Sequence, residues 1–301
     1  MTLGLLRQAG PQATVVGFVD DDRELWGRAV DGVPVLGGAD RLADAVARFG
    51  VGEVVVAVPH RAGSALLGAL AECLHQGVDV VPMSQVYEDL LGRVPVSYLE
   101  SGWLFSSFVE VVRRKDASRV AKRVLDLVGA TAGLVTLAAL TLIIAPAIWL
   151  DSGRPIFFRQ GRLGRGGAPF DLIKFRTMVQ DAEADGPPQW ASRQDPRVTL
   201  VGRFLRRTRL DELPNLVNVL RGEMSLVGPR PERPEFVAQL EREIPFYRTR
   251  LLVRPGLTGW AQVNHPYGDS VRGALEKLEY DLYYVKHRSL FFDLWIVIRT
   301  V

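Results

Sequence analysis

Cysteine is almost absent from this chain of 301 residues, since Cys73 is the only one. A single cysteine excludes an intrachain disulfide framework and a metal site built from several thiolates. The four histidines are His60, His75, His265 and His287, and they show no metal-ligand spacing. The first twenty residues lack the charged and then apolar layout of a secretory signal. We therefore expect the N-terminal part of the chain to stay in the cytoplasm.

Long apolar runs are also scarce, because only residues 124–150 form one of the length that a membrane segment needs, roughly 20 residues. The flanks of this run are basic, with Arg113, Arg114, Lys115, Arg119, Lys122 and Arg123 upstream and Arg154, Arg159, Arg162 and Arg165 downstream. Basic residues beside a membrane segment prefer the cytoplasmic side, so a helix that enters and returns fits better than one that crosses. Pro146 can bend such a helix, and Asp126 fits the membrane interface. An ordinary single span is the alternative.

The net charge of +3 hides an asymmetry between the two parts of the chain. Residues 1–110 hold 7 basic and 14 acidic residues, whereas the remainder holds 30 basic and 20 acidic residues. A basic half beside an apolar segment indicates anionic headgroups or phosphorylated substrates. Nucleic acid is the competing partner, but no zinc-finger, helix-turn-helix or aromatic RNA-binding pattern supports it.

The N-terminal part alternates short apolar runs with helical patterns. We expect strands at 14–19, 33–36, 52–59 and 78–82 and helices at 39–49 and 65–76. This alternation predicts an α/β fold with a parallel, Rossmann-like sheet. No G-x-G-x-x-G follows any of these strands, so a working dinucleotide site is unsupported. We expect a truncated Rossmann-like domain over residues 1–83 and a connector over residues 84–123.

The C-terminal part, residues 151–301, is dense in glycine, proline and arginine, which predicts a compact, mainly helical and loop-rich domain. Within it, Asp211 and Glu212 stand just before Pro214, a favoured first residue of a helix. The arginines around this pair are Arg206, Arg207 and Arg209. Carboxylates beside guanidinium groups stay ionised, and an ionised carboxylate can be a nucleophile that forms an acyl phosphate or a magnesium ligand. Surplus arginines can bind diphosphate oxygens. The alternative is an acidic helix start balanced by surface arginines.

Four motifs follow the apolar run in a fixed order. They are KFRTM at 174–178, LDELPNL at 210–216, SLVGPRPE at 225–232 and RPGLTGWAQVN at 254–264. In this order they resemble the bacterial sugar transferase family, which comprises monotopic phosphoglycosyltransferases acting on polyprenyl phosphate. The resemblance covers about residues 122–301. The N-terminal domain is similar to the nucleotide-binding-like, regulatory domain of larger members.

The resemblance implies a reaction in two steps. Asp211 would attack the sugar-linked phosphate of a UDP-sugar, UMP would leave, and undecaprenyl phosphate would take the sugar phosphate from the aspartate. Mg²⁺ would offset the diphosphate charge, with Asp211 and Glu212 as its candidate ligands. Glu212 would hold the metal or orient the lipid phosphate. The product would initiate exopolysaccharide, capsule or O-antigen assembly.

The resemblance also implies roles for further residues. Arg206 and Arg230 match phosphate-binding positions. Lys174 and Arg176 are further phosphate-binding candidates, with salt bridges to surface acids as the alternative. Trp260 and Gln262 either contact the nucleotide or pack, and Gly256 is expected to shape a turn.

The implied location is the bacterial inner membrane, with the soluble domains facing the cytoplasm and membrane lipids as neighbours. Family members break the membrane helix with a Ser-Pro pair, which corresponds here to Ala138 and Ala139. The identity of the sugar and whether the chain forms a homo-oligomer stay open. Two other functions compete: a silent membrane scaffold of an export complex, and a nucleotide-sugar dehydrogenase or epimerase. The glycine fingerprint and a Tyr-x-x-x-Lys pair that the second would need are both missing.

Overall fold

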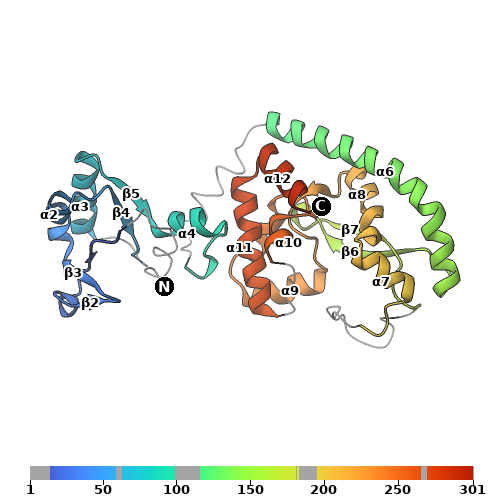
Figure 1. Cartoon of the computed structure of the whole chain (residues 1–301), viewed down its shortest axis with the longest axis horizontal. Coiled ribbons are helices and arrows are strands. Elements are labelled where there is room, and N and C mark those ends of the chain that lie inside the picture. Colours follow the sequence, from blue (N-terminus) through green and yellow to red (C-terminus); the bar gives the residue numbers. More distant parts are fainter. Residues whose placement is uncertain are drawn as a thin grey trace. The chain divides into compact units, whose positions relative to one another are not determined.

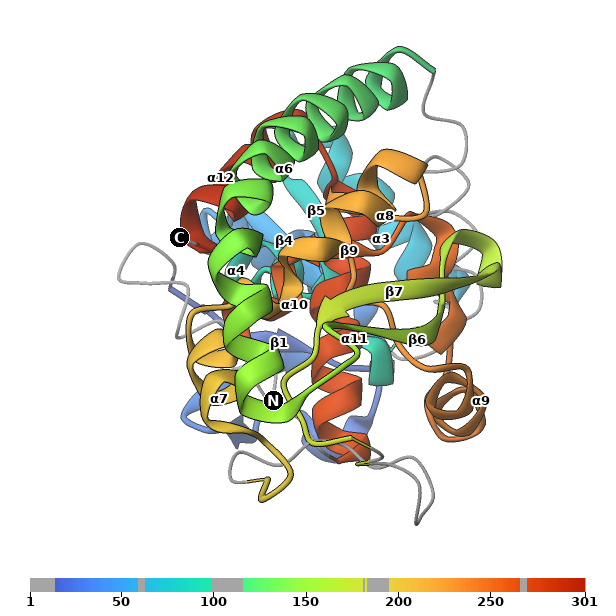
Figure 2. The same cartoon turned by 90° about the vertical axis from the view of Figure 1, so that its right-hand side faces the viewer.

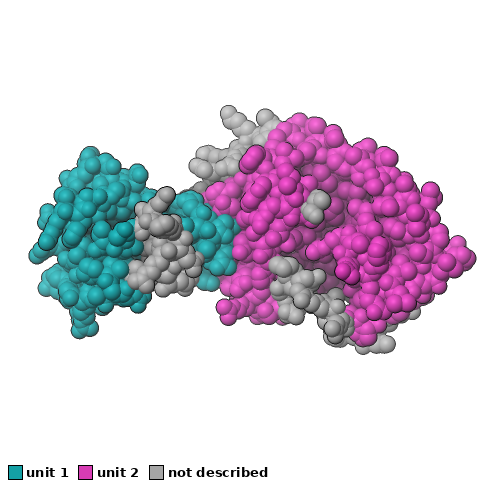
Figure 3. All heavy atoms as spheres, in the orientation of Figure 1, with its two compact units in different colours: residues 1–105 teal, residues 106–301 magenta. Residues whose placement is uncertain are grey.

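The computed structural model describes residues 14–58, 63–98, 116–180, 182, 195–265 and 270–300. The chain divides into two compact units, residues 1–105 and residues 106–301, which Figure 3 shows in different colours. Figure 1 labels the helices and strands of both units. Unit 1 includes α4 and η3, which lie in the segment predicted as a connector.

Unit 1 has the predicted alternation of strands and helices. Its elements are β1 (Phe18–Val19), η1 (Arg23–Leu25), β2 (Ala29–Val30), β3 (Val33–Gly37), η2 (Ala39–Arg41), α2 (Leu42–Phe49), β4 (Glu53–Val56), α3 (Ser64–His75), β5 (Asp79–Pro82), α4 (Met83–Leu91) and η3 (Val96–Tyr98). Strands β1 and β3 pair in parallel, as do β4 and β5. Leu42, Val46, Cys73 and Val78 form the core between α2, α3 and β5. The α/β prediction for this unit is confirmed.

One pair of strands in unit 1 departs from the predicted parallel sheet. Strands β2 and β3 are antiparallel, and a tight turn at Asp31 and Gly32 joins them. Both turn residues have positive φ, 49° and 86°. Asp-Gly is a favoured pair for such a hairpin turn, because both positions require left-handed backbone. The Asp-Gly pair was therefore the sequence signal for this hairpin.

The apolar run lies in α6, a helix of 37 residues over Asp116–Ser152. At 1.5 Å per residue α6 is about 55 Å long. It is continuous through Ala138 and Pro146, so the structure shows no break at the position where relatives carry Ser-Pro. Figures 1 and 2 show α6 following an arched path along unit 2. A long helix curves in this way when one of its faces packs on a core.

The inner face of α6 packs on unit 2. Buried residues of this face are Ala130, Leu137, Ile144 and Ile148, and they contact the residues of α7, α8 and β7 that form the core. Gly129 and Gly133 face the side chains of Leu226 and Leu216 so closely that a Cβ at either glycine would overlap them. Small residues here let the helix approach β8 and α8 directly.

The outer face of α6 is apolar and exposed. Its exposed large residues are Val120, Val124, Leu127, Val128, Val135, Leu142, Ile143, Trp149 and Leu150. The stretch Arg119–Ser152 has the length and composition of a membrane span, although one such helix is weak evidence by itself. Contiguous apolar surface of this size is rare on a protein that faces only water.

Short helices and loops make up most of the rest of unit 2. Its further elements are β6 (Phe157–Leu163), η4 (Arg165–Gly167), β7 (Pro169–Phe175), α7 (Leu200–Arg207), η5 (Leu210–Asn215), α8 (Leu216–Arg221), β8 (Ser225–Val227), α9 (Pro234–Glu243), η6 (Tyr247–Leu252), β9 (Gly256–Thr258), α10 (Trp260–Asn264), α11 (Val271–His287) and α12 (Leu290–Thr300). Strands β6 and β7 form an antiparallel hairpin, and β8 pairs in parallel with β9.

Asp126, near the start of α6, packs against β8 within unit 2. The residue is fully buried in protein. Its Oδ1 accepts hydrogen bonds from Ser225 Oγ at 2.9 Å and from the Leu226 amide at 3.0 Å. Buried carboxylates need such partners. Asp126 therefore ties the first turns of α6 to β8, and its location at the membrane interface stays a prediction.

Candidate active site

The carboxylate pair lies on η5, a 3-10 turn between α7 and α8. Arg209, at the start of η5, has left-handed backbone with φ of 60°. Pro214 lies inside this turn, and α8 begins only at Leu216. The prediction that Pro214 starts the helix was therefore wrong by two residues. Asp211 and Glu212 are both largely buried, at 8% and 9% exposed.

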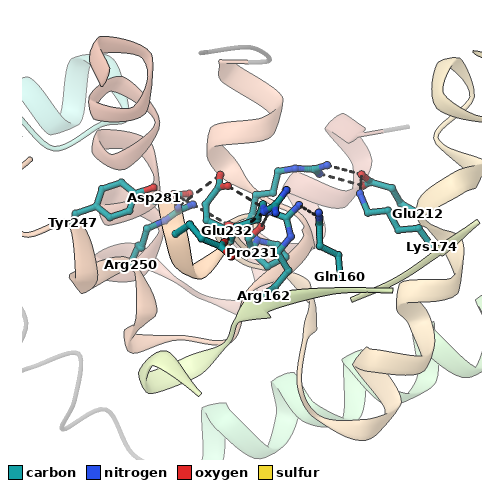
Figure 4. Close-up of polar contacts among 12 residues, drawn as sticks. Gln160, Arg162, Lys174, Glu212, Pro231, Glu232, Tyr247, Arg250 and Asp281 are labelled. Atoms are coloured by element: carbon teal, nitrogen blue, oxygen red, sulfur yellow. Dashed lines mark hydrogen bonds and ion pairs between the residues drawn. The ribbon is translucent and has the colours of Figure 1, made fainter. Parts of the chain in front are cut away.

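Two cations bind Glu212. Lys174 Nζ lies 2.8 Å from Glu212 Oε1, and Arg230 donates to both carboxylate oxygens, at 2.5 Å and 3.2 Å. Figure 4 shows Lys174 and Glu212 meeting at one end of a longer polar network. Burial alone would raise the pKa of Glu212, but Arg230 and Lys174 lower that pKa well below its usual range. Glu212 is therefore ionised and fully engaged.

Asp211 has different surroundings from its neighbour. Among the described residues, no hydrogen bond or ion pair involves its carboxylate. Burial raises the pKa of Asp211, although Lys174, Arg206 and Arg230 act in the opposite direction. The expectation that neighbouring cations keep a carboxylate ionised thus agrees with the lowered pKa of Glu212. At Asp211 burial has the larger effect on the pKa and raises it. Asp211 is a carboxylate without a partner in the field of three cations.

A small hollow with a volume of about 10 Å³, partly open to solvent, is lined by Glu212 but not by Asp211. Its charged lining consists of Arg162, Lys174, Glu212 and Arg230, and its other lining residues are Leu172, Asn215, Met224, Pro231, Gly256 and Leu257. One face of the β6–β7 hairpin supplies three of these, because in the register of the hairpin Arg162 lies opposite Phe170, on the face that carries Leu172 and Lys174. Cations outnumber the single carboxylate of the lining, so the hollow suits an anionic ligand.

Gly256 lines this hollow within strand β9, and it does not form the turn that we expected. A Cβ at this position would overlap the backbone of Gly228. The amide of Gly256 donates to the carbonyl of Pro229 at 2.8 Å. The glycine thus permits β9 to approach the segment that carries Arg230.

Arg206 is close enough to Asp211 to lower its pKa, so the structure brings together Arg206, Lys174 and Arg230 as predicted. Arg206 is held by a hydrogen bond of 2.9 Å from its Nε to Thr177 Oγ1. This contact fixes the guanidinium at the end of α7, where its other nitrogens can bind a ligand.

Arg176 forms no ion pair with an acid among the described residues, and it does not line the hollow. Its NH2 donates to the carbonyls of Ser152 and Gly153, at 2.7 Å and 2.6 Å, and to Ser152 Oγ at 2.9 Å. These acceptors stand at the C-terminal end of α6, where carbonyl groups lack helix partners and favour a cation. Arg176 therefore anchors the end of α6, and its role in phosphate binding stays a prediction.

Trp260 is packed in an aromatic cluster. The indole is 6% exposed and contacts the rings of Tyr280, Tyr283, Phe292 and Trp295, with the Arg299 guanidinium 5.5 Å from its centre. Gln262 donates to the carbonyl of Leu257 at 3.2 Å. Neither residue lines the hollow, and a contact of either with the nucleotide stays a prediction.

Comparisons with known proteins agree with this geometry. The family model described as bacterial sugar transferase matches residues 117–301, more than half of the chain. The chain belongs to this family. A second family model, described as a CoA-binding domain, matches residues 3–83, which supports the Rossmann-like interpretation of unit 1.

Named relatives of this sugar transferase chain come from several bacteria. The UDP-N-acetylgalactosamine-undecaprenyl-phosphate N-acetylgalactosaminephosphotransferase of Aeromonas hydrophila is 41% identical over 77% of this chain and 53% of its own length. A UDP-glucose:undecaprenyl-phosphate glucose-1-phosphate transferase of Xanthomonas campestris is 34% identical over 89% and 56%. One with the same name from Caulobacter vibrioides is 48% identical over 60% and 68%. The chain spans about half the length of the first two relatives.

Sequence reasoning about this family member missed several residues of the site. Arg162 and Asn215 both line the hollow, but neither was chosen as a site residue. Asn215 follows Pro214 in the same motif, which was a usable signal. Asn218 is fully buried, and its amide group donates to the Asp171 carbonyl and to Glu223, both at 2.7 Å. It joins α8 to β7, and only the structure shows this role.

The expected magnesium ligands were Asp211 and Glu212. Among the residues that the structure describes, no group of three or more metal-ligating side chains is present. Glu212 is already bound by Lys174 and Arg230. Of these two carboxylates, only that of Asp211 has no such partner in the described part of the chain. Mg²⁺ keeps several waters and often uses one or two carboxylates together with substrate phosphates, so this donor set fits an ion that a diphosphate brings with it.

Proposed function

We propose that this protein transfers a sugar-1-phosphate from a UDP-sugar to undecaprenyl phosphate and releases UMP. The observation that carries the proposal is Asp211, a buried carboxylate without a partner among the described residues, in the field of Lys174, Arg206 and Arg230. The names of the relatives describe this class of transfer. An unpaired carboxylate beside several cations suits nucleophilic attack on a phosphorylated substrate.

In the first step, an Asp211 oxygen attacks the phosphorus that carries the sugar. The bond from this phosphorus to the oxygen of UMP breaks, UMP leaves as an anion, and an aspartyl phosphosugar forms. In the second step, a phosphate oxygen of undecaprenyl phosphate attacks the same phosphorus, and the carboxylate of Asp211 leaves. Because negative charge grows on the oxygens during each attack, the three cations around Asp211 stabilise the transition states.

Glu212 acts through the cations that it binds. Its carboxylate holds Lys174 and Arg230 on one side of Asp211. A carboxylate that already accepts these hydrogen bonds is a poor nucleophile, which separates the roles of the two neighbours. Glu212 therefore positions the cations and keeps them from pairing with Asp211.

Mg²⁺ is the proposed cofactor. Asp211 is the protein group that would hold it, together with oxygens of the diphosphate. When bound, the ion offsets part of the diphosphate charge. Arg206, Lys174 and Arg230 supply the protein's share of this neutralisation, and Arg162 adds a fourth cation at the wall of the hollow.

The anchoring of α6 supports insertion into the membrane from one side. At the start of α6, Arg123 donates to the carbonyls of Val219 and Leu220, at 2.7 Å and 2.8 Å. At its end, Asp151 accepts from the Val201 amide at 3.0 Å, and Arg176 binds the last carbonyls. Both ends thus attach to the same catalytic domain, whereas a crossing helix would place them on opposite sides. We propose that α6 enters and leaves the bilayer at one face.

We propose that this arrangement of α6 brings the site near the headgroups. The exposed apolar residues of α12 continue the proposed membrane surface, and they are Leu290, Phe291, Leu294, Trp295 and Ile298. Apolar helix faces of this kind lie in the interfacial zone. Undecaprenyl phosphate could then present its phosphate while its tail stays in the lipid.

We assign the protein to the bacterial inner membrane, with the catalytic domain on the cytoplasmic side. We assign a regulatory role to unit 1.

Release of UMP by the purified full chain in lipid nanodiscs tests the proposal. The assay supplies a panel of UDP-sugars with Mg²⁺ and undecaprenyl phosphate. We expect turnover with at least one sugar, loss of turnover in Asp211→Asn, and wild-type rates in Asp171→Asn, a matched change at an exposed carboxylate of β7. Turnover that survives Asp211→Asn would remove the nucleophile from the proposal. No turnover with any UDP-sugar would support the silent scaffold instead.

A further inference from the structure

We propose that the buried ion pair between Arg250 and Asp281 is a positioning device for Arg230, and through Arg230 for Glu212. Neither member of the pair lines the hollow. The inference deepens the proposed function and rests on it, because it names residues that act on the site from outside.

The pair lies behind the segment that carries Arg230. Arg250 comes from η6 and is 5% exposed, and Asp281 comes from α11 and is 1% exposed. Arg250 NH2 lies 2.7 Å from Asp281 Oδ2, and the same nitrogen donates to the main-chain carbonyl of Arg230 at 3.0 Å. Arg250 NH1 donates to Tyr247 Oη at 2.9 Å. Figure 4 shows Tyr247, Arg250 and Asp281 at the opposite end of the network from Lys174 and Glu212.

A second arginine supports the same segment from β6. Arg162 NH1 donates to the carbonyl of Pro231 at 3.2 Å and lies 3.6 Å from Glu232 Oε2. Glu232 Oε1 in turn lies 3.9 Å from Arg250 NH1. Residues 230, 231 and 232 are thus each contacted by Arg250 or Arg162. The main chain of Arg230 is fixed from behind while its guanidinium reaches Glu212.

The prolines on both sides of Arg230 strengthen this argument. Pro229 and Pro231 fix their own φ angles and remove two backbone donors. The segment therefore has two fewer amides to donate, and several of its carbonyls accept hydrogen bonds from other parts of the chain. The donors are Arg250 for residue 230, Arg162 for residue 231 and the Gly256 amide for Pro229.

Stability alone does not explain a pair buried this deeply. Removing two charges from water often costs more than their attraction returns, and apolar replacements of such pairs are often neutral. Burial raises the pKa of Asp281 to about 6, although Arg250 opposes the shift. The other groups that face Asp281 are Lys277 from α11, Tyr247 from η6 and Glu232 from the segment after β8. What the pair does supply is a fixed donor for the Arg230 carbonyl.

The test compares the double variant Arg250→Met, Asp281→Asn with Arg248→Met in the full chain. Arg248 is a matched control, because it lies on the same η6 turn and forms an exposed ion pair with Glu241 at 3.1 Å. Two quantities are measured. Hydrogen exchange of the amides in residues 228–233 reports the order of the segment without any substrate, and kcat and KM for UMP release report its consequence.

We expect faster exchange in residues 228–233 of the double variant and a fall in kcat of about tenfold or more, because small displacements of positioning groups are costly. KM should change less than kcat, and Arg248→Met should match the wild type in both. Wild-type exchange, or faster exchange with a wild-type kcat, would overturn the positioning role. If the wild type releases no UMP from any UDP-sugar, the proposed function fails, while the exchange comparison still decides whether the pair orders the segment.

Should the double variant not fold, Arg250→Lys serves instead. A lysine keeps the charge beside Asp281, but its single nitrogen cannot reproduce the planar fork that serves Asp281, Tyr247 and the Arg230 carbonyl together. Faster exchange in residues 228–233 with reduced kcat supports the proposal, and wild-type values of both contradict it.

Discussion

Asp211 and Glu212 are adjacent in sequence and similarly buried, yet only Glu212 is bound by cations in the described structure. Lys174 and Arg230 both bind Oε1 of Glu212. The same cations lower the pKa of Asp211 through space, without an ion pair to its carboxylate in the described structure. One residue is therefore assigned to positioning and its neighbour to nucleophilic attack.

The first prediction concerns Asp211→Asn. Because burial raises the pKa of Asp211, the ionised form is costly in the folded protein, and removal of the charge relieves this cost. We expect a variant that is inactive in UMP release but at least as stable as the wild type in thermal unfolding. A clear loss of stability would show that Asp211 has a structural role.

The second prediction concerns Glu212→Gln, for which we expect the opposite change in stability. The substitution leaves Lys174 and Arg230 without their shared counter-ion. Since the hollow is open to solvent, a loss of about 2 kcal/mol is expected, or roughly 5 °C in Tm. Thermal unfolding of the two variants side by side measures this difference. Equal Tm values for Asp211→Asn and Glu212→Gln would contradict the separation of roles.

The third prediction concerns pH. As pH falls through the raised pKa of Asp211, the nucleophile takes up a proton, so kcat should decline at a pH above the ordinary value for aspartate, about 3.9. The folded state holds this proton more tightly than the unfolded chain, so protonation of Asp211 adds stability in the same window. The stability advantage of Asp211→Asn at neutral pH should therefore shrink on acidification. Unfolding curves and kcat against pH measure both effects, and a constant advantage at all pH values would refute the assignment.

Glu212 has the reverse sign in the same experiment. Its pKa is lowered in the folded state, so its contribution to stability is present above the ordinary glutamate value and is lost as pH falls through the lowered value. The Glu212→Gln penalty should accordingly diminish only at more acidic pH than the Asp211→Asn effect.

Part of the site could be predicted from the sequence. The Asp-Glu pair, Lys174 and Arg230 come from three separate motifs, and Arg206 stands shortly before the LDELPNL motif. Arg176 belongs to the same KFRTM motif as Lys174 but anchors α6. Strand β7 ends at Phe175, so Arg176 lies just beyond it, and residues 174 and 176 would share one face of a continued strand. The pattern therefore could not show that the two residues have different surroundings.

The fourth prediction distinguishes packing from nucleotide binding at Trp260. Trp260→Phe removes contacts with Tyr280, Phe292 and Trp295, so we expect a loss of about 2 kcal/mol, or roughly 5 °C in Tm. KM for the UDP-sugar should stay at the wild-type value. A raised KM with an unchanged Tm would return Trp260 to the nucleotide site.

In the fold, too, features set by neighbouring residues could be predicted from the sequence, whereas features set by distant residues could not. The strands and helices predicted for unit 1 overlap β1, β3, β4, β5, α2 and α3, because hydrophobic periodicity is a local signal, but β2 and α4 were not predicted. The continuous path of α6 along unit 2 depends on Gly129 and Gly133 meeting Leu226 and Leu216, nearly one hundred residues later in the chain. No local pattern contains that information, so neither this packing nor the burial of Asp126 could be predicted.

The fifth prediction concerns the ends of α6. Single cysteines at Val124 and Trp149, both exposed, are introduced after the buried Cys73 is replaced by serine. If α6 enters and leaves at one face, a membrane-impermeant thiol reagent should label both positions from the cytoplasmic side of oriented vesicles. Labelling of the two positions from opposite sides would show that the helix crosses.

The most direct test of the account is the mass of the protein during turnover. The wild type is incubated with its UDP-sugar and Mg²⁺ without undecaprenyl phosphate, quenched, digested and analysed by mass spectrometry. The account predicts one added sugar phosphate on the peptide that contains Asp211, its absence in Asp211→Asn, and its disappearance when undecaprenyl phosphate is supplied. Release of UMP with no adduct on that peptide, or with the adduct on another residue, would contradict it.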